Sequence, residues 1–134
     1  MIHMFKKHHA WLLPALYALL LLALSSIPNF STDDITPAVS DKFWHTAGYM
    51  PLGFLLYFAI DLHPGAFAAL PGFSALFLGI GYGTLNELYQ YFVPGRAVDM
   101  NDLACNIAGV IIGTMLYLVF QKMRLAKIKS PYDR

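Results

Sequence analysis

The chain has 134 residues, of which 57% are hydrophobic and 13% are charged, and its mean hydropathy is +0.53. An ordinary soluble domain carries about a quarter charged residues, so this composition argues against one. The formal net charge of +1 gives no reason to expect a nucleic-acid partner, and the single cysteine, Cys105, excludes an intrachain disulfide. This length predicts one domain, residues 1–134.

Apolar runs recur four times along the chain, over about residues 10–27, 46–62, 72–91 and 103–120. Each is close to the ~20 residues that cross a hydrocarbon core about 30 Å thick. One such run is compatible with a buried helix of a soluble protein, but four leave too little polar sequence to cover them. We therefore predict an all-α polytopic membrane protein with four transmembrane helices.

The first run has a second interpretation. Lys6 and Lys7 precede it, and small residues follow it, as in a secretory signal peptide. The run is longer than a typical signal-peptide core, so we expect it to be retained as a helix. Cleavage would leave the sidedness of the remaining chain unchanged.

Basic residues predict how the helices are oriented. Of the nine Lys and Arg residues, all but Lys42 and Arg96 flank the two ends of the chain. The positive-inside rule then places both termini of a multi-pass membrane protein on the cytoplasmic side. The loops that follow the first and third runs face outward, and most acidic residues gather there. These acids are Asp33, Asp34, Asp41, Glu87, Asp99 and Asp102.

Helical spacing arranges polar residues and glycines in stripes, with the polar members toward the outer end. The polar members are Asp41, His45, Tyr49, Glu87, Gln90, Asp102 and Asn106, with Lys42 beside the first stripe. We expect the glycines of "GIGYG" (79–83) and "GVIIG" (109–113) to draw the third and fourth runs together. Pro94-Gly95 predicts a tight turn that folds the third loop over the helix ends.

Glu87 is the strongest single candidate. An acid inside a membrane span is by default a hypothesis of function, because burying its charge is costly. We expect it to approach His45 and Arg96; the alternative is that it only neutralises a nearby cation. Asn106 is either a hydrogen-bonding contact between helices or a member of a site, and Asp41 either orients His45 or caps its helix.

Three segments together resemble the VanZ-like family: "DKFWHTAGYMPLGFLL", "GYGTLNELYQYFVPGRAVDMNDLACNIAGVIIG" and "LSSIP". The resemblance covers about residues 20–120 and implies a small multi-span bacterial membrane protein. The family is named for an accessory protein of glycopeptide-resistance clusters that gives low-level teicoplanin resistance. The signature positions it implies are Asp41, Lys42, His45, Tyr49, Glu87, Gln90, Pro94, Arg96, Asp99, Asp102, Asn106 and Gly109.

The favoured hypothesis of function is an outward-facing pocket of the cell envelope that binds an anionic lipid or a lipid-linked cell-wall precursor. Lys42 and Arg96 would hold its phosphate, and apolar flanks would hold its chain. The expected ligand-binding residues are Asp41, Lys42, His45, Tyr49, Glu87, Gln90, Arg96, Asp99, Asp102 and Asn106. We expect no cofactor.

Three alternatives stay open. The first is a membrane-embedded hydrolase or transferase acting on a lipid head group, with His45 and Glu87 as acid and base. The second and least favoured is a divalent metal site of His45, Glu87, Asp99 and Asp102. The third is a purely structural cluster of ion pairs that ties the helices together.

Overall fold

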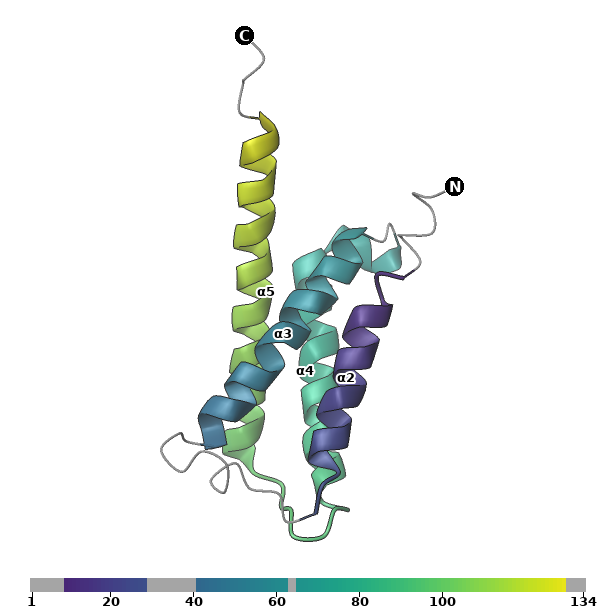
Figure 1. Cartoon of the computed structure of the whole chain (residues 1–134), viewed down its shortest axis with the longest axis vertical. Coiled ribbons are helices and arrows are strands. Elements are labelled where there is room, and N and C mark those ends of the chain that lie inside the picture. Colours follow the sequence, from purple (N-terminus) through teal and green to yellow (C-terminus); the bar gives the residue numbers. More distant parts are fainter. Residues whose placement is uncertain (1–8, 29–40, 63–64, 130–134) are drawn as a thin grey trace.

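The computed structural model describes residues 9–28, 41–62 and 65–129. Within them the chain is all-α, and no strand occurs (Figure 1). The elements in chain order are α2 (Leu12–Ser25), α3 (Asp41–Leu62), the short 3-10 helix η2 (Ala66–Ala69), α4 (Pro71–Gln90) and α5 (Met100–Lys129). Each of the four predicted apolar runs forms one α-helix.

Helix bounds differ from the apolar runs where polar residues join a helix. α3 begins at Asp41, whereas the run predicted a start near residue 46. The carboxylate of Asp41 in the first turn favours this earlier start, because the N-terminal end of a helix carries partial positive charge. Lys42 and His45 are therefore helical and are held in a fixed rotation relative to Tyr49.

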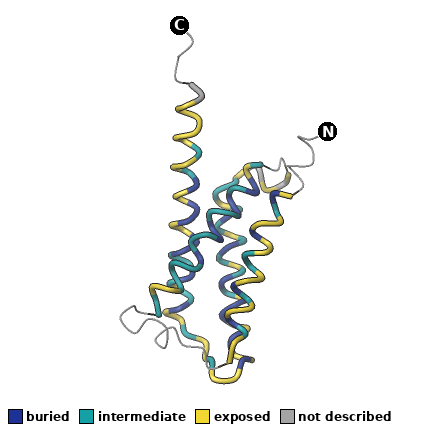
Figure 2. Tube along the Cα trace, viewed as in Figure 1, coloured by how far each residue is buried: buried dark blue, intermediate teal, exposed yellow. Residues whose placement is uncertain are grey.

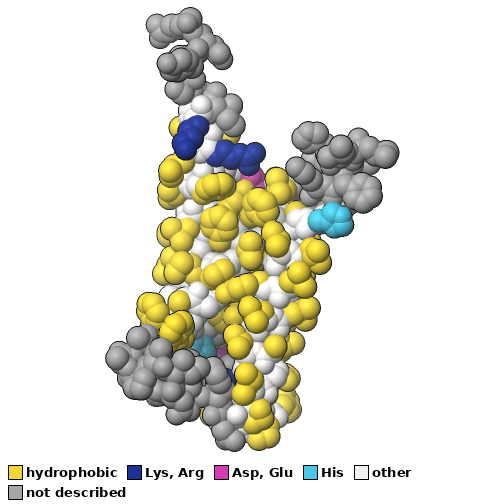
Figure 3. Space-filling view, viewed as in Figure 1, with side chains coloured by type: hydrophobic (Ala, Val, Ile, Leu, Met, Phe, Trp, Pro, Cys, Tyr) yellow, Lys and Arg dark blue, Asp and Glu magenta, His cyan; other side chains and the backbone are white. Residues whose placement is uncertain are grey.

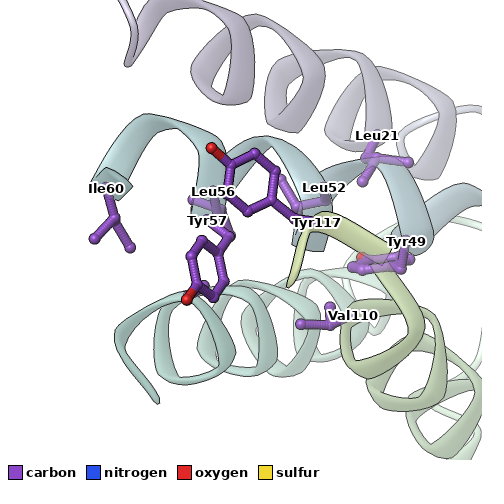
Figure 4. Close-up of a cluster of buried hydrophobic side chains, with 9 residues drawn as sticks. Leu21, Tyr49, Leu52, Leu56, Tyr57, Ile60, Val110 and Tyr117 are labelled. Atoms are coloured by element: carbon purple, nitrogen blue, oxygen red, sulfur yellow. The ribbon is translucent and has the colours of Figure 1, made fainter. Parts of the chain in front are cut away.

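The helices form an elongated bundle in which α3 contacts each of the other three helices and packs most extensively against α5. The buried core follows these contacts, while the outer face of α2 and the C-terminal part of α5 are exposed (Figure 2). Tyr57 and Tyr117 stack at the centre of the buried cluster, with ring centroids 4.8 Å apart (Figure 4). Val110 of α5 belongs to the same cluster and is fully buried.

Glycines bring α3 and α5 into backbone contact. A Cβ atom on Gly109 would overlap the carbonyl of Thr46, and a Cβ atom on Gly113 would overlap the carbonyl of Met50. We expected the "GVIIG" glycines to face the third apolar run, which forms α4. This expectation was wrong, because Gly109 and Gly113 face α3, which is formed by the second run. The glycines of α4 are used differently: Gly79 faces Val110 of α5, as predicted, while Gly81 has nothing near it.

Of the described helices, one is both long and apolar enough to cross a membrane by itself, the α5 segment 100–127. α2 is apolar but has 14 residues, which corresponds to about 21 Å at 1.5 Å per residue. α3 and α4 have 22 and 20 residues, and each carries polar side chains at one end. Hydrophobic side chains cover most of the face of the bundle in Figure 3.

The two ends of the bundle differ in charge. The start of α2 and the end of α5 lie at one end of the bundle (Figure 1), and this part of α5 carries Lys122, Arg124 and Lys127. Basic side chains are visible on this end of α5 in Figure 3. Residues 91–99, which join α4 to α5, lie at the opposite end. The carboxylates and histidine of the predicted site are at this second end, which we call the polar end.

Candidate functional site

A tight turn shapes the connection between α4 and α5. The amide of Arg96 donates a hydrogen bond of 3.1 Å to the carbonyl of Val93, and Gly95 has a φ of +78°. Proline second and a glycine with positive φ third in such a turn are the features of a type II turn. The predicted turn at Pro94-Gly95 is confirmed. It places Arg96 against the end of α2, where its Nη2 atom lies 3.5 Å from the carbonyl of Leu24.

Glu87 holds the connection between α4 and α5 in place through a hydrogen bond. Its carboxylate, in a residue only 1% exposed, accepts a 2.9 Å hydrogen bond from the backbone amide of Asp99 and a 3.4 Å bond from Gln90 Nε2. His45, one of the two partners expected for Glu87, interacts with this carboxylate electrostatically, whereas the hydrogen bonds come from Asp99 and Gln90. A buried acid that holds a loop amide stabilises the loop, because that amide would otherwise lack a partner.

Lys42 forms a bridge between α3 and the start of α5. Its ammonium lies 2.7 Å from Asp99 Oδ2 and also contacts Asp102 Oδ1. Lys42 donates hydrogen bonds to Asp102 and Asp99, and these bonds raise the pKa of Lys42 above its usual range and lower the pKa of Asp99. The second oxygen of Asp99 accepts the Asn101 amide at 2.8 Å and so caps α5.

The lowered pKa of Asp99 predicts a specific pH dependence. A carboxylate whose pKa is lower in the folded protein adds stability above its unfolded pKa of about 3.9, and that stability is lost as the pH falls through the folded pKa. In detergent, the difference in melting temperature between wild type and Asp99→Asn should be full at neutral pH and should shrink below about pH 4. A difference that stays constant down to pH 3 would contradict the Lys42–Asp99 pair.

His45 lies where α3 meets α5. Its Nδ1 atom is 3.0 Å from Asn106 Oδ1. Its Nε2 atom is 3.5 Å from Asp41 Oδ2 and 3.5 Å from Asp102 Oδ2. Both ring nitrogens therefore face oxygen atoms, and the ring is held between two helices.

A cavity of about 280 Å³ opens beside this cluster, between α2, α3 and α4. Its polar lining residues are Ser25, Asp41, His45, Asn86, Gln90 and Arg96. Its more apolar lining residues are Tyr17, Leu20, Leu21, Leu24, Trp44, Gly48 and Tyr49. The polar and charged groups thus gather toward one end of the cavity, and α2 supplies an apolar wall.

The predicted site residues fall into two groups. Asp41, His45, Tyr49, Gln90 and Arg96 line the cavity. Lys42, Glu87, Asp99, Asp102 and Asn106 are absent from its lining and join the hydrogen bonds and ion pairs around it. The two basic residues expected to clamp one phosphate have different surroundings: Lys42 contacts Asp99 and Asp102, while Arg96 lines the cavity.

The sequence interpretation missed Asn86 and the contribution of α2. Asn86 Nδ2 donates to Ser25 Oγ and to Tyr49 Oη, each at 2.8 Å, and so joins α2, α3 and α4. Its spacing of three residues from Gly83 and four from Gln90 puts it on the predicted polar stripe, which was the available signal. Apart from Ser25, the residues of α2 that line the cavity are leucines and Tyr17, and an apolar surface offers no such signal.

These features define a class: a small all-α protein with an apolar exterior, one clearly membrane-length helix and a polar cluster beside a cavity at one end. A family model described as VanZ/LLP1 matches residues 2–121. The chain belongs to this family of membrane proteins, as the resemblance in its motifs predicted.

One curated relative is a protein of Schizosaccharomyces pombe described as "Uncharacterized protein C11E3.10". It is 27% identical over 111 residues, which is 83% of this chain and 66% of the relative. The chain therefore spans slightly less than two thirds of the relative's length. No solved structure matches the chain.

Proposed function

We propose that the protein spans a bacterial cytoplasmic membrane with all four α-helices, with both termini in the cytoplasm and the polar end outside. The basic residues near the end of α5 support this orientation, because positive side chains are enriched on cytoplasmic ends. Lys122, Arg124 and Lys127 belong to the last turns of α5, at the end of the bundle opposite the polar end. In this orientation the cavity opens at the outer head-group level.

Cysteine accessibility tests this orientation. In a Cys105→Ala background, Val98→Cys should react with a membrane-impermeant maleimide added to intact cells, and Met123→Cys should react only after permeabilisation. Both positions are exposed, at 38% and 57%, so burial does not explain a difference between them. Labelling of Met123→Cys from outside would overturn the proposed topology.

We further propose that the cavity binds an anionic lipid, or a lipid-linked cell-wall precursor, by its phosphate and the first part of its chain. The observation that carries the proposal is the pairing of Arg96 with an apolar wall in one cavity. A guanidinium matches phosphate geometry with two parallel donors. Leu20 and Leu24 line the cavity and are also 51% and 42% exposed, so the wall continues onto the apolar exterior where a chain can lie.

Asn86 adds a polar group that fits a ligand. The residue is 4% exposed and lines the cavity, yet its Oδ1 atom has no hydrogen-bond partner in the described part of the chain. A buried polar atom without a partner is costly. A bound head group that hydrogen-bonds this amide would remove the cost.

The fungal relative narrows the chemistry of the proposed lipid ligand. Fungi build no peptidoglycan, so a ligand common to this chain and its relative would be a lipid that carries a phosphate or pyrophosphate. A lipid-linked cell-wall precursor meets that description in a bacterium. The proposal includes a role in teicoplanin resistance, and this part of it rests on the resemblance to VanZ alone.

A steric block tests the cavity without touching its charges. Gly48 lines the cavity, and a Cβ atom there would make an ordinary contact with Leu21 at 3.7 Å, so a side chain can be introduced without a backbone clash. We expect Gly48→Phe to lower anionic lipid co-purified with the protein at least tenfold, as measured by mass spectrometry of extracted lipid. Gly81→Phe, on an open face of α4, is the matched control. Equal lipid in both variants would contradict binding in the cavity.

An enzymatic role on the same lipid is the second candidate. His45 lines the cavity while Asn106 holds its Nδ1 atom, which suits a general acid or base. Glu87, its proposed partner, accepts loop hydrogen bonds and does not line the cavity. Release of phosphate or a head group by wild type, lost in His45→Gln, would support this candidate. Lipid recovered unchanged would count against it.

A further inference from the structure

We propose that Asp41, His45 and Asp102 bind one divalent transition-metal cation, of the Mn²⁺ or Zn²⁺ type, at the polar end of the cavity. Among the residues that the structure describes, these three present ligand atoms that all lie within 4.8 Å of one another. They come from two helices packed in backbone contact, α3 and α5. Their positions are therefore held by the rigid part of the bundle.

The distances around His45 fit a cation. Ligand atoms bound about 2.1 Å from one metal ion, at angles between octahedral and tetrahedral, are separated by about 3.0–3.4 Å. His45 Nε2 lies 3.5 Å from an oxygen of Asp41 and 3.5 Å from an oxygen of Asp102. This spacing is long for direct hydrogen bonds, and it is close to the separation of two ligands of one cation.

The surroundings of these ligands support the same conclusion. Asn106 Oδ1 accepts from His45 Nδ1 at 3.0 Å, which leaves the Nε2 lone pair toward the carboxylates. Metal-bound histidines commonly use the second nitrogen in this way. Asn106 is 1% exposed, and its amide nitrogen has no partner among the described residues. A water molecule bound to the cation could accept a hydrogen bond from this amide nitrogen.

Charge also favours a dication. The acidic groups of the polar end are more numerous than the basic groups among the described residues. The acids are Asp41, Glu87, Asp99 and Asp102, and the basic residues are Lys42 and Arg96. Lys42 contacts one oxygen of Asp102 and leaves the other for the cation.

A cation here would also deepen the proposed function. Asp41 and His45 line the cavity that Arg96 lines, and the Asp41 carboxylate alone would repel a phosphate. A metal ion with open positions toward the cavity would bridge the carboxylates to the phosphate. This bridging role rests on the proposed function, whereas cation binding does not require a lipid.

Manganese binding to delipidated protein tests the site. Protein stripped with EDTA in a non-ionic detergent is titrated with Mn²⁺, and free Mn²⁺ is followed by electron paramagnetic resonance. We expect one Mn²⁺ per chain, with nitrogen coupling in the bound spectrum that disappears in His45→Gln. Asp41→Asn and His45→Gln should weaken binding at least tenfold. Asn106→Ala should weaken it about 10–100-fold, as for other groups that orient a metal-bound histidine.

The control is Asp61→Asn, which removes a carboxylate at the other end of α3, where it accepts hydrogen bonds from Tyr117 and Gln121. Its Mn²⁺ affinity should match wild type. The side chain of Asp41 is 40% exposed, so Asp41→Asn should fold even if another variant does not. Binding absent up to about 1 mM Mn²⁺, or unchanged in Asp41→Asn, would overturn the site. Anionic lipid retained equally with Mn²⁺ and with EDTA would overturn the bridging role alone.

Discussion

Arg96→Gln should reduce the anionic lipid that co-purifies with the protein about 10–100-fold. A charge-assisted hydrogen bond to phosphate contributes roughly 1.5–3 kcal/mol, and each ~1.4 kcal/mol changes affinity tenfold. Arg96 lines the cavity, while its hydrogen bond to the carbonyl of Leu24 is 3.5 Å long and exposed. We expect lipid binding per folded molecule to fall, because the guanidinium lines the cavity. The measurement is lipid per folded molecule after identical purification.

Two further variants make this result specific. Arg96→Lys keeps the charge and loses the planar pair of donors, so it should lie between wild type and Arg96→Gln. Arg124→Gln removes a cation at the opposite end of the bundle and should retain wild-type lipid. If Arg96→Gln instead loses folded protein while lipid per folded molecule is unchanged, Arg96 is structural and the cavity proposal loses its main support.

Gly113→Ala should destabilise the protein by about 2–3 kcal/mol, at the upper end of the cost of overpacking a tight interior. The added Cβ would meet backbone atoms of Met50 and Phe54, and backbone atoms cannot rotate away as a side chain does. α3 and α5 would have to separate. Since Lys42, His45 and their partners are divided between these two helices, the polar cluster should loosen as well.

Gly81→Ala is the matched control, because a Cβ atom there meets nothing within 4 Å. It should be neutral or slightly stabilising, since alanine is favoured over glycine inside a helix by up to about 1 kcal/mol. Unfolding in detergent, followed by circular dichroism, compares the two variants. Equal stability would contradict the close contact of α3 with α5.

The helices could be predicted from the sequence because long apolar runs report burial directly. The start of α3 could not, since Asp41 and Lys42 are polar residues in a helix that continues beyond the apolar run. The turn at Pro94-Gly95 was predictable because a glycine after proline satisfies a local backbone requirement.

Rotation and pairing of the helices were harder to predict. Periodicity places residues on one face of a helix but does not say which neighbour that face contacts. The glycines at 109 and 113 were accordingly assigned to the wrong partner. In the same way Lys42 and Arg96 belong to one charged end, yet they point to different places: an ion-pair bridge and a cavity.

The most direct test of lipid binding in the cavity is photo-crosslinking with benzoylphenylalanine at two positions in native membranes. Leu24 lines the cavity, while Leu85 is 69% exposed on α4 and does not line it. Position 24 should capture a lipid with a phosphate or pyrophosphate head group, enriched at least tenfold over its share of the membrane. Position 85 should capture lipids in their bulk proportions. The same lipid composition at both positions would contradict the central claim.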